Sequence, residues 1–141
     1  MAQGLSKNDL QKLAQAKADD ALLLFHHGRF SNAYYLGGYS VEFALKACIA
    51  ARMQEHTIPD KNFISEVFVH NLVRLVNLAG LTRELKEQED LRPIFHANWG
   101  IVTKWNERKR YDVTDRSTTQ FFLEAIGNPD DGVLPWIQRY W

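Results

Sequence analysis

Between Gly28 and Met53 the chain reads GRFSNAYYLGGYSVEFALKACIAARM, and its apolar residues recur at helical spacing. Glu42 and Lys46 are the only charges in the interior of this stretch. Because residues four apart on a helix are neighbours, the carboxylate and the ammonium can neutralise each other while apolar side chains pack around them. The stretch therefore predicts a helix at the centre of a helical bundle.

The composition sets the class of protein. The chain has 141 residues, enough for one domain spanning residues 1–141, with 17 basic and 17 acidic residues. A net charge of zero means that any contact with nucleic acid must come from a local patch. The single cysteine, Cys48, lies in the apolar stretch and is expected to pack as a small hydrophobe. Without a signal-like N-terminus or about 18 consecutive apolar residues, we expect a cytoplasmic protein that does not span a membrane.

Capping and stop signals predict the first two helices. Ser6 and Asp9 resemble a helix start, so the first helix is expected over residues 7–27 and to end at Gly28. Ser31 or Asn32 can cap the central helix, which is expected to run to about residue 54. This helix contains two adjacent glycines, Gly37 and Gly38. In a helix interior each glycine is less stable than alanine by about 1 kcal/mol. They indicate close approach of a neighbouring helix, or of a ligand, to bare backbone.

The second half is expected to consist of shorter helices. After a loop over residues 56–61, the predicted segments are 62–78, 82–90, 91–109, a helix capped by Asp115 or Ser117 and ending near Ile126, and a last helix from about residue 131. Pro135 fits only in the first turn of that last helix. Since no stretch alternates with a period of two, we predict an all-α, up-and-down bundle of four to five main helices.

Residue types that bind metals or phosphates do not form recognisable patterns. The five histidines are not spaced as a zinc site would require: His26, His27, His56, His70 and His96. Neither GxGxxG nor a P-loop is present, and no serine stands in a nucleophile elbow. We therefore expect no metal and no cofactor.

Residues 104–111, KWNERKRY, form the densest basic patch. Cations interleaved with aromatic rings suit phosphates and stacked bases. The alternative is a helix C-terminus whose cations complement the helix dipole. His70 and Asn71 are interpreted in the same structural way, as the polar start of a helix whose apolar residues follow.

Several of these elements together resemble the HEPN family, the helical domains named for higher eukaryotes and prokaryotes nucleotide-binding. Residues 41–47, VEFALKA, are similar to the A-x-E-x-x-L-K signature, and residues 70–72 with Leu75 to the H-[DN]-L-x-x-L element. Arg110 and Tyr111 resemble the arginine–tyrosine step, and the chain closes with the similar PDDGVLPWIQRYW. The resemblance extends from about Ala16 to the C-terminus.

The resemblance implies a bundle that often forms a homodimer and, in microbes, often pairs with a minimal nucleotidyltransferase in toxin–antitoxin or defence systems. Many members are metal-independent ribonucleases that use an arginine and a histidine separated by four to six residues. This chain departs from that pattern, because Arg52 and His56, like Arg92 and His96, have three residues between them. No histidine follows Arg108, Arg110 or Arg116.

Three hypotheses about function remain. The first is a non-catalytic module that binds a nucleotide, RNA or a nucleotidyltransferase partner. Its candidate ligand-binding residues are Arg29, Lys46, His70, Lys104, Arg108, Arg110 and Tyr111, with Glu42 and Asn71 in support. The second is a divergent ribonuclease in which folding brings His70 or His96 near Arg110. The third is a structural interaction protein whose aromatic surface comprises Trp99, Trp105, Trp136, Tyr140 and Trp141.

Overall fold

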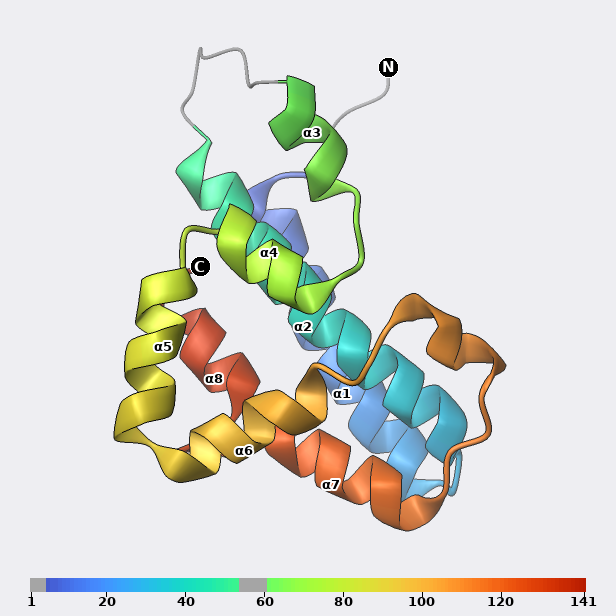
Figure 1. Cartoon of the computed structure of the whole chain (residues 1–141). Coiled ribbons are helices and arrows are strands. Elements are labelled where there is room, and N and C mark those ends of the chain that lie inside the picture. The colour runs from blue at the N-terminus through green and yellow to red at the C-terminus, as the bar shows by residue number, and fades with distance from the viewer. Residues whose placement is uncertain (1–4, 54–60) are drawn as a thin grey trace, which may run out of the picture.

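The computed structural model describes residues 5–53 and 61–141, and all regular structure in these two ranges is helical (Figure 1). The elements are α1 (Lys7–His26), α2 (Phe30–Arg52), α3 (Lys61–Val67), α4 (Leu72–Leu78), α5 (Thr82–Leu91), α6 (Pro93–Val102), the 3-10 helix η1 (Glu107–Tyr111), α7 (Arg116–Gly127) and α8 (Val133–Gln138). The predicted all-α class is therefore confirmed for the described residues. The predicted loop over residues 56–61 lies almost wholly outside them.

Helices α1 and α2 form a hairpin whose signals are local. Ser6 and Asp9 make a reciprocal capping box, and Gly28 adopts φ +75°, which ends α1 as predicted. The predicted cap of α2 is wrong, because Arg29 occupies the N-cap position and its side chain makes no capping hydrogen bond. Ser31 has another partner: its Oγ accepts a hydrogen bond from the backbone N–H of Thr114, 2.8 Å away.

Helix α2 lies at the centre of the core. It packs against α1, α4, α7, α8 and η1, and its buried residues point to several sides. Figure 1 shows α1 running beside it, with α7 below and α8 to the left. Burial of apolar surface on several sides of this helix is the main stabilising contribution to the fold. In the described residues, no helix has the length and apolar character needed to cross a membrane.

The two glycines in the middle of α2 are contact points. A Cβ on Gly37 would lie 2.8 Å from a methyl carbon of Leu123 in α7, and a Cβ on Gly38 would lie 2.0 Å from the indole of Trp105. The predicted close approach is therefore confirmed. The neighbours are a helix at Gly37 and a tryptophan side chain at Gly38.

The expected helix over residues 91–109 is wrong in its second half. Helix α6 ends at Val102, because Trp105 turns inward against α2 and its Nε1 donates a 3.1 Å hydrogen bond to the carbonyl of Tyr35. Asn106 then starts η1, its Oδ1 accepting from the backbone N–H of Arg108 at 2.9 Å. Residues 104–111 are thus a loop and a 3-10 turn, and they are not the end of an α-helix.

The boundaries of the remaining helices are explained by their capping residues and by a proline. The segment 62–78 is split, because Asn71 caps α4 with its side chain and residues 68–71 lie outside both helices. Asp115, one of the two predicted residues, caps α7, and Pro135 stands in the first turn of α8.

Most of the proposed aromatic surface is core. Trp99, Trp105 and Trp136 are buried, and Tyr140 and Trp141 are partly buried against the same core. Burial removes the three tryptophans from any surface that a partner could contact, so the structure contradicts this form of the interaction hypothesis.

Candidate functional site

A buried carboxylate in α2 receives hydrogen bonds from two basic side chains. Glu42 is 1 % exposed, and its Oε1 accepts from Nδ1 of His70 at 2.8 Å. Its Oε2 accepts from Nζ of Lys46 at 3.2 Å. Lys46 lies one turn further along α2, whereas His70 comes from the loop before α4. The contact therefore satisfies a buried charge and also fastens this loop to the central helix. Glu42, His70 and Lys46 are referred to below as the Glu42 triad.

Two tyrosines extend the polar row along α2. The hydroxyl of Tyr35 donates to that of Tyr39 at 3.2 Å, and the ring of Tyr39 meets the rings of His70 and Trp105 edge-on. Burial raises the pKa of Tyr39 well above its ordinary value of 10, and the nearby carboxylate of Glu42 acts in the same direction. Tyr39 therefore keeps its proton and remains a neutral group between the triad and Trp105.

A groove of about 490 Å³ opens beside the triad. One wall is the loop that carries His70 and the start of α4, and the other is the loop between α6 and η1; the lining residues are Val69, His70, Asn71, Leu72, Val73, Thr103, Trp105, Asn106 and Glu107. Because the Glu42 carboxylate holds Nδ1 of His70, Nε2 is the ring nitrogen left to act in the groove. The volume is within the range of small-ligand sites. This space is called the His70 groove below.

The cations of residues 104–111 belong to the segment that forms one wall of this groove, but none of them lines it, and Lys109 and Tyr111 line a separate pocket with Tyr34. Lys104 and Arg108 are exposed, and each neighbours residues that line the groove. The guanidinium of Arg110 stacks over the ring of Tyr111 at 4.7 Å and donates a 2.7 Å hydrogen bond to its hydroxyl. That bond, with a smaller contribution from Tyr35, raises the pKa of Arg110. Tyr111 is the exposed aromatic of this segment, because Trp105 is buried.

Two of the residues considered in the sequence lie elsewhere. Arg29 precedes α2 and Lys46 is 17 positions later, which separates their backbones by about 25 Å along the helix axis. Arg29 therefore does not share a small-ligand site with the Glu42 triad. His96 lies in the first turns of α6, where its Nδ1 bonds the carboxylate of Glu89 in α5. Figure 1 shows this end of α6 on the opposite side of the molecule from η1.

Sequence reasoning missed several lining residues. Thr103, Asn106 and Glu107 were expected inside one long helix. Asn106 did carry a usable signal, since asparagine followed by an acidic residue is typical of a helix start. The pairing of His70 with Glu42 had no such signal, because the two residues are 28 positions apart.

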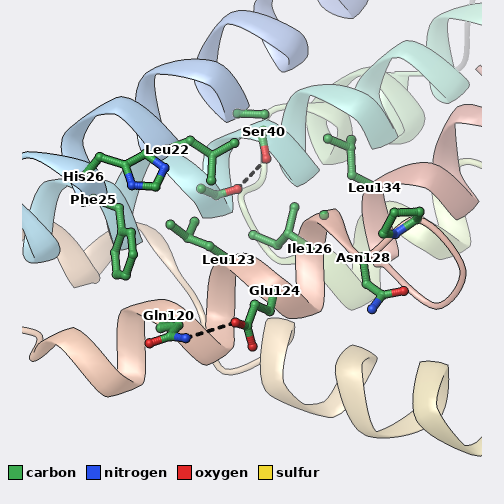
Figure 2. A pocket seen from close by; sticks show the side chains of 14 residues that line it. Leu22, Phe25, His26, Ser40, Gln120, Leu123, Glu124, Ile126, Asn128 and Leu134 are labelled. Atoms are coloured by element: carbon green, nitrogen blue, oxygen red, sulfur yellow. Dashed lines mark hydrogen bonds between the residues drawn. The ribbon is translucent and has the colours of Figure 1, made fainter.

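A second cavity, of about 540 Å³, lies between α1, α2 and α7 (Figure 2). Leu22 and Phe25 approach from α1, and Leu123 and Ile126 from α7. The polar groups drawn in Figure 2 are largely bonded to their neighbours: Ser40 Oγ donates to the carbonyl of Gly37 at 2.6 Å, and Gln120 donates to Glu124 at 3.1 Å. Few polar groups remain there to orient a ligand, so the His70 groove is the better candidate site.

Neither a search for metal ligands nor comparison with known proteins indicates a function for this chain. In the described ranges, no three side chains of histidine, cysteine, aspartate or glutamate gather as metal ligands would. No protein-family model, curated protein or solved structure matches this chain.

Proposed function

We propose that the chain is a HEPN-type module that binds a nucleotide or RNA in the His70 groove. The single observation that carries this proposal is the buried Glu42 carboxylate, which holds His70 at the edge of a groove. The exposed Lys104 and Arg108 adjoin lining residues of its other wall in the chain. Lys104 and Arg108 would meet phosphates at the rim of the groove. The stacked pair of Arg110 and Tyr111 lies outside it, since Tyr111 lines a separate pocket, and would offer a flat face to a second base of an RNA.

The geometry favours a local site on a chain of zero net charge. Asn71 and Asn106 face the groove from opposite walls, and amide groups of this kind read base edges. Val69 and Val73 supply apolar contact on one wall. A few polar groups in a partly apolar groove of this volume are typical of small-ligand sites.

Fluorescence anisotropy with a labelled single-stranded RNA tests the proposal. Lys104→Glu and Arg108→Glu should each weaken binding at least about tenfold at low salt, because each reverses a charge beside the groove. Arg83→Glu, whose side chain is 82 % exposed on α5, is the matched control and should leave the affinity unchanged. Equal effects of all three variants, or no binding of RNA and nucleotides by the parent protein, would contradict the proposed function.

A partner protein belongs to the same proposal. The sequence resemblance implies a homodimer and a minimal nucleotidyltransferase partner in a toxin–antitoxin or defence system. Large apolar side chains are exposed on α1, α6 and α7, including Leu22, Ile94 and Phe121, and are available to such contacts. Light scattering of the purified protein, alone and mixed with a minimal nucleotidyltransferase, tests both associations.

One observation favours a second candidate, the divergent ribonuclease. A carboxylate that holds Nδ1 of a histidine fixes the ring so that neutral Nε2 can accept a proton, here that of a ribose 2′-hydroxyl. The 2′-oxygen would then attack the adjacent phosphorus to form a 2′,3′-cyclic phosphate, and the P–O5′ bond would break with the 5′-oxygen taking a proton from water. In this candidate His70 has the role of the base, whereas His96 is held by Glu89 away from Arg110. RNA cleavage in EDTA that is lost in His70→Ala and retained in His96→Ala would support it.

A further inference from the structure

Two asparagine side chains that line the His70 groove can act as hydrogen-bond donors to a ligand. Oδ1 of Asn71 accepts from the backbone N–H of Arg74 at 3.0 Å, and Oδ1 of Asn106 accepts from that of Arg108 at 2.9 Å. The donors fix both amides, so each asparagine has its NH₂ group left for a ligand. The groove is thus supplied with amide donors from both walls.

The acceptor of the groove is a carboxylate. Glu107 is half-buried and lines the wall next to Asn106. Among the side chains that the structure describes, none forms an ion pair or hydrogen bond with its carboxylate. One wall thus holds the Glu107 carboxylate beside the amide of Asn106. The opposite wall holds the amide of Asn71 and Nε2 of His70. A ligand can supply the hydrogen-bond partners that these groups lack.

We infer that the His70 groove selects a guanine base, an inference that rests on the proposed nucleotide-binding function. Guanine offers two adjacent donors, N1–H and the N2 amino group, which a carboxylate accepts together. It also offers two adjacent acceptors, O6 and N7, which amide donors satisfy. Glu107 accepts from the two donors, Asn106 donates to O6, and Asn71 donates to N7 from the opposite wall.

The other bases match this set less well. Uracil has a single ring donor between two carbonyl acceptors, so it makes one bond to Glu107 where guanine makes two. Adenine and cytosine present an unprotonated ring nitrogen beside their amino group, and that nitrogen faces a carboxylate unfavourably. The expected order of affinity is guanine, then uracil, then adenine and cytosine.

Titration calorimetry with the four ribonucleoside 5′-monophosphates tests the order. Guanosine monophosphate should bind at least about tenfold more tightly than adenosine monophosphate, the discrimination expected of one bidentate pair. Glu107→Gln should remove most of that ratio, because an amide offers one acceptor where the carboxylate offers two. Glu87→Gln, on the exposed face of α5, is the matched control and should keep it. Thermal melting of each variant verifies that it is folded.

A second titration separates the base preference from nucleotide binding itself. Labelled oligoadenylate RNA, with and without one guanosine, is added to the parent protein. A preference for the guanosine-containing RNA supports the inference, also when mononucleotides bind too weakly to measure. Equal binding of both RNAs, or of all four mononucleotides, overturns the guanine preference and leaves the proposed function standing. Absence of binding in every titration overturns both.

Discussion

The indole of Trp105 lies against the bare backbone of Gly38, so close that a Cβ on this glycine would be 2.0 Å from the ring. The contact joins the middle of α2 to the loop that forms one wall of the His70 groove. Trp105 is also held by the hydrogen bond from its Nε1 to the carbonyl of Tyr35. The position of this wall therefore depends on a glycine that lies in the interior of a helix.

Gly38→Ala is expected to destabilise the protein by about 3 kcal/mol or more. The added methyl group must displace an indole that is packed and hydrogen-bonded, and overpacking of a core has effects of this order. Gly100→Ala in α6 is the matched control: a Cβ there meets nothing within 4 Å, so the helix should gain up to about 1 kcal/mol. Urea unfolding measures both. Equal stability of the two variants would show that Trp105 can move away freely.

Glu42→Gln is expected to lower the free energy of unfolding by about 3 kcal/mol. The amide cannot neutralise Lys46, whose side chain is 14 % exposed, and removal of one partner of a buried ion pair leaves the other charge uncompensated. Chemical denaturation at pH 7 checks the value. Glu84→Gln on α5 should change stability by less than about 0.5 kcal/mol. A loss in Glu42→Gln no larger than in this control would mean that the triad contributes little to folding.

Cys48 is expected to make the protein less stable at alkaline pH. Burial raises the pKa of its thiol from 9.0 to about 12. Below pH 9 the thiol is protonated in both the folded and unfolded states, and its contribution is fully present. Between pH 9 and about 12 only the unfolded chain releases the proton, so stability falls with a slope of up to about 1.4 kcal/mol per pH unit.

Cys48→Ala isolates this contribution. The raised pKa values of Tyr34 and Tyr39 act in the same direction above pH 10, but they are present in both proteins. The slope of unfolding free energy against pH, measured from pH 8 to 11, should therefore be shallower in Cys48→Ala. Identical slopes would indicate that the thiol ionises in the folded state as readily as in the unfolded chain.

Features that depend on neighbouring residues could be predicted from the sequence. The capping box of Ser6 and Asp9, the stop at Gly28 and the cap at Asp115 all act within one helical turn. The pairing of Glu42 with Lys46 is equally local, because residues four apart on a helix always meet. The all-α class follows from such signals.

Features that depend on tertiary packing could not be predicted from the sequence. Residues 103–109 carry a helical pattern, yet the chain leaves the helix because Trp105 gains more by burial against Gly38 and by its bond to Tyr35. The Glu42 triad was found only in part, since His70 reaches Glu42 across 28 residues. Glu107 and Asn106 became lining residues because this loop crosses α2, an arrangement that no spacing in the sequence indicates.

Deletion of Tyr140 and Trp141 is expected to destabilise the fold by about 2 kcal/mol. Both side chains are partly buried against the core, and the ring of Tyr140 meets that of Trp136 edge-on at 5.5 Å. Partial burial of two aromatic side chains corresponds to a loss of this size. Tyr111→Ala, which removes a ring that is 74 % exposed, is the control and should have little effect on urea unfolding. If the shortened chain keeps full stability but light scattering shows a smaller oligomer, the C-terminal aromatic pair serves an interface between copies instead of the core of one chain.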